Sequence, residues 1–315
     1  MRKTLATVAI MLLVFSLVPL GCTKSSENDE EAIRTLLNSS AYTNEEQTRG
    51  YGADDSTPTQ GGGGFLAGSL YDGYDTIPFV RFRRFIPAGG ISRTIVINIP
   101  AYPAYPDTTA LATINSDIQG KFLNCFDTTT NPLYVWRKSV HDQAVRKVYL
   151  TKHDNRWHVR KLSPLEFTTV DPAYELRVVE LSAHATSWPV SDTFCLITAD
   201  TLLTRDELPC FVPADTVTVW VTATTTGDSC WAFLHHGRPK WPFRWRRPYF
   251  KTGTMTFERT WHIGPEGYER PQVRPSGHDA IGWSTLLGDS SKPYVAAAWG
   301  VPYIVKNPDE QIPEE

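Results

Sequence analysis

The spacing of apolar residues changes from a helical period to an alternating one along the first half of the chain. Ile33, Leu36 and Leu37 recur at helical spacing, with acidic residues in the preceding turn, so the pattern predicts a helix over 29–40. From residue 79 onward, apolar, aromatic and β-branched residues predict strands over 79–86, 91–99 and 110–124. In the last strand, Ala110, Ala112, Ile114, Ile118 and Phe122 fall on one face, and polar residues fall on the other.

A hairpin is predicted next. Apolar runs at 145–151 and 157–162 flank the turn residues His153-Asp154-Asn155-Arg156, and Ser163-Pro164 ends the second run. A leading helix followed by antiparallel strands that pair in chain order favours an α+β domain with one curved sheet over 30–167.

The order of these elements carries a resemblance. The helix at 30–37, the strand at 110–124 and the hairpin with Lys152 to Val159 resemble the cone-shaped nuclear-transport-factor-two-like superfamily. The resemblance implies a cone-like domain with a curved antiparallel sheet, whose mouth serves enzymes in some members and binding modules in others. Its isomerase-type members use a carboxylate facing a phenol, and no Asp or Tyr here matches that motif, so the resemblance assigns no catalytic residue.

The second half predicts an all-β domain over 172–306. In its clearest strand, Val217, Val219 and Val221 alternate with polar residues, and the turn residues at 225–228 follow. Strand candidates lie at 174–181, 193–198, 215–225, 230–235, 254–263, 280–287 and 294–305. This pattern favours a β-sandwich that is immunoglobulin-like in texture only, because the Cys-Trp-Cys spacing is absent. We place the domain boundary at 168–172 and expect the acidic tail, 307–315, to be disordered.

The N-terminus predicts export. Arg2 and Lys3 precede an apolar run at 5–20, which is typical of a signal peptide over 1–21. The segment ending in Gly21-Cys22 resembles a bacterial lipoprotein lipobox, although Pro19 and Leu20 depart from the usual pattern. The resemblance implies acylation of Cys22, a polar tether over 22–29, and outer-membrane sorting in a Gram-negative host, because Thr23 follows the cysteine. A plain signal peptide with an unrelated Cys22 is the alternative.

The number of remaining cysteines is typical of a protein in an oxidising compartment, but the sequence does not determine which of them form disulfide bonds. Cys125, Cys195, Cys210 and Cys230 are even in number and allow three connectivities. The short loop between Cys195 and Cys210 is one candidate for a disulfide bond, and buried free thiols are the alternative. Because no C-x-x-C pair exists, we expect no metal at these cysteines.

Composition excludes several classes of protein. The chain has 315 residues, 41% hydrophobic and 21% charged, which suits a soluble fold of about two domains. Its net charge is −3, and loss of Arg2 and Lys3 with the leader leaves 29 basic against 34 acidic residues, or −5. A nearly balanced charge argues against nucleic acid as a partner.

No motif names a chemistry. The phosphate-binding, dinucleotide, zincin and α/β-hydrolase motifs are absent from the sequence, and Ser284 lacks the second glycine of a nucleophile elbow. His235, His236, His262 and His278 could converge on a metal, but adjacent histidines in a strand point to opposite faces, and exposed or loop histidines are the favoured interpretation. We therefore expect no metal and no cofactor, and catalytic residues stay unknown.

One segment has an unusual composition. Residues 237–251 contain six cations, five aromatic residues and three prolines, with no acid. We predict that this extended hairpin loop contacts an anionic envelope component such as anionic lipid, peptidoglycan or another glycan. The residues expected to bind are Arg238, Lys240, Trp241, Phe243, Arg244, Trp245, Arg246 and Arg247. The alternative is a structural loop whose aromatic rings cover the sandwich.

The sequence therefore predicts a lipid-anchored protein of the bacterial cell envelope that acts as a non-catalytic binding or assembly module. The alternative function is a small-molecule enzyme or carrier that uses the cavity of the cone-like domain. The two would differ in whether the cone holds a deep polar pocket.

Overall fold

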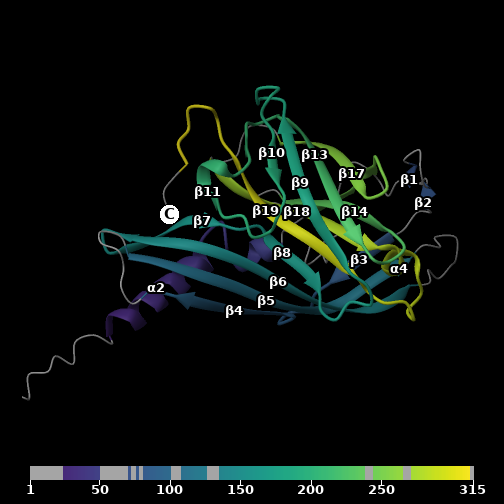
Figure 1. Cartoon of the computed structure of the whole chain (residues 1–315), viewed down its shortest axis with the longest axis horizontal. Helices are drawn as coiled ribbons and strands as arrows, with labels where there is room; N and C mark the ends of the chain where they lie inside the picture. The colour runs from purple at the N-terminus through teal and green to yellow at the C-terminus, as the bar shows by residue number, and fades with distance from the viewer. Residues whose placement is uncertain are drawn as a thin grey trace, which may run out of the picture.

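The computed structural model describes residues 24–49, 70–71, 76–77, 81–100, 108–125, 135–237, 244–264 and 271–312. This part of the chain is mostly β-structure, arranged as a long curled sheet crossed by a smaller sheet (Figure 1). The predicted signal peptide and Cys22 lie outside the described residues, so those predictions stay open.

The curled sheet is antiparallel except for one short parallel pair between β12 and β19. Its central path runs β11-β7-β6-β8-β19-β18-β14-β15, and β5 extends it from β6 to β3 and β4. Its strands are β3 (Arg81–Phe85), β4 (Ile91–Asn98), β5 (Thr108–Cys125), β6 (Trp136–His153), β7 (Arg156–Leu162), β8 (Leu165–Thr169), β11 (Leu203–Thr204), β12 (Cys210–Phe211), β14 (Cys230–Gly237), β15 (Arg244–Pro248), β18 (Gln272–Gly282) and β19 (Ala296–Val305).

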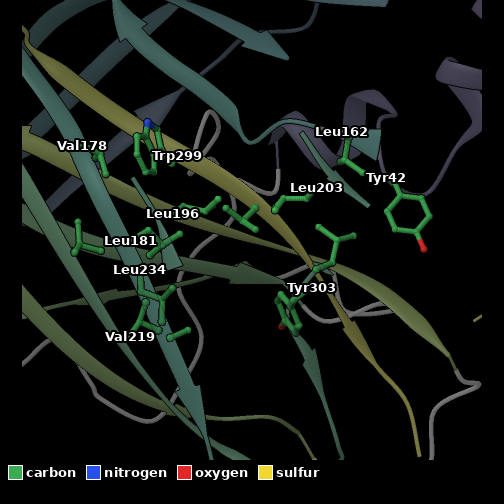
Figure 2. Close-up of a cluster of buried hydrophobic side chains, with 14 of the residues drawn as sticks. Tyr42, Leu162, Val178, Leu181, Leu196, Leu203, Val219, Leu234, Trp299 and Tyr303 are labelled. Carbon is green, nitrogen blue, oxygen red and sulfur yellow. The ribbon is translucent and has the colours of Figure 1, made fainter. Parts of the chain in front are cut away.

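The second sheet has the order β10-β9-β13-β17-β16 and packs one face onto the curled sheet. Its strands are β9 (Leu176–Ala185), β10 (Phe194–Leu196), β13 (Thr216–Thr225), β16 (Phe250–Lys251) and β17 (Thr256–His262). Figure 2 shows the apolar layer between the sheets, where Val219 and Leu181 face Trp299 and Tyr303. The remaining elements are α2 (Lys24–Ser39), α3 (Glu45–Thr48), α4 (Trp283–Leu287), the 3-10 turn Arg205–Glu207, and a short pair of strands, β1 (Leu70–Tyr71) and β2 (Thr76–Ile77).

The alternating patterns of the first half are confirmed. All five apolar residues predicted for one face of β5 are buried. β5 and β6 pair over 17 registered positions. β5 closely matches the predicted strand, whereas β6 begins nine residues before the predicted run at 145–151. Asp154 (φ 48°) and Asn155 (φ 60°) occupy the left-handed region between β6 and β7, the conformation that a two-residue hairpin turn of this hand requires.

The first helix is longer than predicted. It begins at Lys24, so most of the expected tether at 22–29 is helical instead. A polar side chain in that stretch is bound to the sheet: the Asp29 carboxylate accepts from Lys152 Nζ at 2.6 Å and from Trp157 Nε1 at 3.1 Å. The spacing of hydrophobic residues could not predict the first turns of α2, because the buried face of this helix begins only at Ile33.

Two further expectations near the C-terminus are wrong. The strand predicted over 280–287 ends at Gly282 and continues as α4. Gly282 lies against the Tyr174 hydroxyl, where an added Cβ would come within 1.9 Å, and Lys138 Nζ binds the carbonyl oxygens of Ser284 and Thr285 in α4. Residues 307–312 of the expected disordered tail are ordered, because Glu310 accepts from the Asn307 backbone and side-chain nitrogens. Residues 313–315 lie outside the described residues.

The division into an α+β body and an immunoglobulin-like sandwich is not confirmed. β8, which immediately precedes the expected boundary at 168–172, pairs with β6 on one side and with β19 on the other. One apolar cluster contains residues from both halves, among them Ile33, Val148, Val219 and Trp299. The curled sheet is therefore continuous across the expected boundary.

We expect that residues 27–167 and 172–306, expressed separately, do not unfold cooperatively. Separation breaks the β8–β19 pairing and exposes apolar surface in both halves. Urea titrations followed by far-UV circular dichroism and tryptophan fluorescence would measure this. A cooperative transition in either half alone would show that the shared sheet is dispensable.

Candidate functional site

Residues 237–251, which we call the cationic segment, contribute an edge strand to the curled sheet. β15 pairs with β14 from Phe233↔Pro248 to Gly237↔Arg244. Arg246 and Arg247 are partly exposed there. Residues 238–243, and with them Arg238, Lys240, Trp241 and Phe243, lie outside the described residues, as do the side chains of Arg244 and Trp245. Binding by this set therefore stays a prediction.

Arg246 has a structural contact inside the molecule. Its guanidinium donates to the Phe82 carbonyl oxygen at 2.7 Å and stacks over the Phe82 ring, 3.6 Å from the ring centroid. Phe82 belongs to β3 and Arg246 to β15, which lie at opposite ends of the strand path through the sheet. The curl therefore brings these two strands together, and Arg246 links them.

A buried ion pair lies beside this link. The Arg84 guanidinium donates to both Asp279 oxygens, at 3.1 and 3.5 Å, and His235 Nε2 lies 3.2 Å from Asp279 Oδ2. All three residues are at most 3% exposed. Burial alone would raise the pKa of Asp279, but Arg84 and His235 outweigh it and lower that pKa below its usual value. Asp279 is therefore an anion held between two donors.

A second buried carboxylate has the opposite tendency. Asp142 Oδ2 accepts from the Tyr294 hydroxyl at 2.7 Å, and its Oδ1 accepts from Thr169 Oγ1 at 3.0 Å. Burial raises the pKa of Asp142, although Arg84 and these hydrogen bonds partly oppose the shift. Burial also raises the pKa of Tyr294 well above its ordinary value. We call Arg84, Asp142, His235, Asp279 and Tyr294 the interior polar cluster.

The interior polar cluster resembles an acid–base pair in chemistry, since two carboxylates have pKa values displaced in opposite directions. Its surroundings are closed, however. Aromatic rings pack around it, with Phe82 stacked on Phe122 at 5.1 Å, edge-on to Phe233 at 4.9 Å, and Phe122 5.7 Å from Tyr294. The cluster is therefore a buried network within a packed interior, and a substrate would have to displace these rings to reach it.

An open groove of about 540 Å³ lies on the outer face of the curled sheet. The turn at 87–90 forms one wall, and Phe85 and Lys121 line it. Gly90 and Gly120 allow the turn to approach β5, because a Cβ on either would come within 2.6 Å of backbone oxygen. The Asp117 carboxylate in the groove already binds His141 and Gln119, and the His141 bond lowers its pKa. We assign no ligand to this groove.

The histidines are not the exposed or loop residues that were expected, except for His262. His235 and His236 do point to opposite faces, as predicted: His235 meets Asp279, and His236 stacks against Trp261 at 6.2 Å. His278 is 2% exposed. Over the described ranges, no group of three His, Cys, Asp or Glu residues is placed to hold a metal ion.

His278 lies in a buried hydrogen-bonded chain. Ser276 Oγ donates to the Val301 carbonyl at 2.8 Å, so His278 Nε2 donates to Ser276 Oγ at 3.2 Å, and His278 Nδ1 accepts from the Tyr249 hydroxyl at 2.7 Å. Burial, with the charge of His235, lowers the pKa of His278 to about 3. The ring is therefore neutral in the folded protein at any moderate pH.

Two other candidates are resolved by their contacts. Ser284 is the second residue of α4, just after β18, and its Oγ is bound to the Tyr174 hydroxyl at 2.8 Å. Burial raises the pKa of that phenol, so the partner of the serine is not a base that would activate it. Cys195, Cys210 and Cys230 are free thiols, so the candidate Cys195–Cys210 bridge is absent. Burial raises the pKa of Cys230 to about 12, which keeps that thiol unreactive.

We expect Asp279→Asn to destabilise the protein by about 3–5 kcal/mol, because it leaves Arg84 as an uncompensated buried charge. Asp142→Asn is the matched control. It removes a carboxylate whose charge is less well stabilised than that of Asp279, because burial raises the pKa of Asp142, so we expect a smaller loss of about 1 kcal/mol. Urea unfolding of both variants at pH 7 measures the difference, and an equal or reversed order would contradict the assignment of Asp279 as the anion.

We expect acidification from pH 7 to 5 to cost roughly 2 kcal/mol through His278 alone. Its pKa is 6.5 in the unfolded chain and about 3 in the folded one. The unfolded state therefore gains a proton as the pH falls through 6.5 while the folded state does not, and stability is lost. His278→Gln, compared with wild type by urea unfolding at both pH values, should show a pH 7-to-5 loss smaller by this amount. An unchanged loss would mean that His278 is not the group responsible.

Comparison with known proteins identifies no similar protein. No protein-family model, curated protein sequence or solved structure matches the chain. Among the described residues, no helix is long and apolar enough to cross a membrane. The functional interpretation therefore depends on the residues and geometry of this chain.

Proposed function

We propose that this protein is an exported, lipid-anchored component of the bacterial cell envelope that acts as a non-catalytic binding or assembly module. The observation that carries the proposal is the filled interior of the curled sheet. Phe122, Asp279 and Ile281 there are at most 1% exposed, and Tyr294 is 7% exposed. A ligand would therefore bind to outer surfaces.

The alternative, a small-molecule enzyme or carrier built on a nuclear-transport-factor-two-like cone, would use that interior. The Asp142–Tyr294 pair is the feature that favours it, since a carboxylate facing a phenol is what isomerase-type members of that superfamily use. Against it, Phe82, Phe122 and Phe233 pack around the pair. The packed rings make the binding function the better supported of the two.

The cationic segment is the surface that we propose for contact with the envelope. The cations proposed to bind an anionic component are Arg238, Lys240, Arg244, Arg246 and Arg247, and Arg246 also donates to the Phe82 carbonyl oxygen. Each Lys or Arg near an anionic membrane surface contributes about 1 kcal/mol before screening by salt. Attachment through acylated Cys22 would hold the segment close to that surface and raise its effective concentration.

Membrane association in a native-like host tests both parts. We expect Cys22→Ala to move the protein from the membrane fraction to the soluble fraction at physiological salt. At low salt, the purified Cys22→Ala protein should bind vesicles of mixed anionic and zwitterionic lipid. Adding Lys240→Glu, Arg244→Glu and Arg247→Glu should weaken that binding about a hundred-fold, as expected for three cations.

A triple variant on β7 serves as the charge-matched control. Arg156→Glu, Arg160→Glu and Lys161→Glu make the same change in net charge at exposed positions away from the segment. Retained membrane association of Cys22→Ala would overturn the anchor. Equal loss of vesicle binding in the two triple variants, or no vesicle binding at low salt, would overturn the role of the segment.

A further inference from the structure

The five-stranded sheet has a second face, turned away from the curled sheet. Along β13, Val217, Val219 and Val221 are at most 1% exposed and pack into the core. The intervening residues, Thr216, Thr218, Trp220, Thr222 and Thr224, point the other way and are partly or fully exposed. This outer face is therefore rich in hydroxyl groups.

Two exposed aromatic residues lie in one row across this outer face. Glu258 of β17 pairs with Trp220 on one side and with Phe250 of β16 on the other, so all three side chains share the face. Trp220 is 36% exposed and Phe250 53%. The two residues are separated by two strand spacings, roughly 9–10 Å between their backbones.

The polar groups of the outer face are already arranged by cross-strand contacts. Trp220 Nε1 donates to Glu258 Oε2 at 3.0 Å, and Thr218 Oγ1 lies 3.1 Å from Thr260 Oγ1. Thr216 Oγ1 lies 2.9 Å from His262 Nδ1. Hydroxyl groups can donate and accept at once, so these rows keep capacity for a ligand while they hold the side chains in place.

The chemistry of the outer face selects a class of ligand. An apolar partner would remove the hydroxyl rows from water without replacing their hydrogen bonds, which is costly. Glu180 and Glu258 on the face outnumber the exposed cation Arg177, which disfavours a polyanion. A chain of sugar rings fits better, because its C–H faces can lie on the negative faces of aromatic rings while its hydroxyls bond to the rows.

We propose that the outer face of the five-stranded sheet binds one extended, uncharged β-1,4-linked glycan chain. Such a chain is flat, and its two-sugar repeat is about as long as the distance between Trp220 and Phe250. The rings would stack on sugars two units apart, and Glu258 would accept hydroxyl hydrogen bonds between them. Phe250 belongs to the C-terminal end of the cationic segment (237–251), but β16 lies in the five-stranded sheet whereas β15 lies in the curled sheet. The glycan site therefore uses a different face and an uncharged ligand, and it does not depend on the lipid anchor.

Calorimetric titration of the full chain with cellohexaose and chitohexaose tests the proposal. We expect the wild type to bind at least one of the two, and Trp220→Ala to weaken binding by at least about ten-fold, as for a central aromatic anchor. Phe250→Ala should weaken binding in the same direction. The affinity should be almost independent of salt, because no charge pairing is involved.

Phe85→Ala is the matched control, since Phe85 is also an exposed phenylalanine (41%) but lies on the curled sheet. It should leave glycan binding unchanged, as should the triple charge reversal in the cationic segment. Absence of binding by the wild type, or equal losses in Phe85→Ala and Trp220→Ala, would overturn the proposal. So would sedimentation that shows self-association abolished by Trp220→Ala, because the face would then be an interface between copies of the chain.

Discussion

The ion pair between Arg84 and Asp279 is the interaction on which the arrangement of the curled sheet most depends. Arg84 comes from β3 and Asp279 from β18, 195 residues apart in the chain. Since neither side chain reaches water, each needs the other, and the pair fixes how far the sheet must curl. The contact of Arg246 with Phe82 lies beside this ion pair and likewise holds β15 against β3.

This one contact also determines the electrostatics of the interior. Arg84 lowers the pKa of Asp279 and acts in the same direction on Asp142, yet burial dominates at Asp142 because its remaining partners are neutral hydroxyl groups. The pKa values of the two carboxylates are therefore displaced in opposite directions, although both carboxylates are packed among the same aromatic rings. Displaced pKa values of this kind often mark catalytic sites, but here the packing of Phe82 and Phe122 accounts for the desolvation without a substrate.

Local patterns in the sequence predicted local structure well. The alternation predicted the strand β5, and the turn residues Asp154 and Asn155 predicted the β6–β7 hairpin, because both signals act within a few residues. Local patterns could not predict that both halves of the chain share one sheet, since the β8–β19 pairing joins segments about 130 residues apart. Both faces of β19 are buried, so its sequence is a continuous apolar run. Such a run has no alternation from which the neighbouring strands could be predicted.

The candidate sites show the same division. The cationic segment was visible from composition, but the contact that occupies Arg246 was not, because Phe82 lies far away in the sequence. The interior polar cluster had no sequence signal at all: Arg84, Asp142 and Asp279 stand in strands where isolated charges usually face water. The row of Trp220, Glu258 and Phe250 depends on strand register, which only the fold supplies.

The late position of β19 has a kinetic consequence. β19 pairs with β8, β12 and β18, and all ten of its residues are buried, so strand pairing leaves the curled sheet in two pieces until β19, which follows every other described strand, has been made. During synthesis, the long β5–β6 hairpin must therefore wait with its inner face uncovered while more than a hundred further residues emerge. Contacts of such high sequence separation form slowly, so both pieces keep apolar surface exposed to chaperones until β19 joins them.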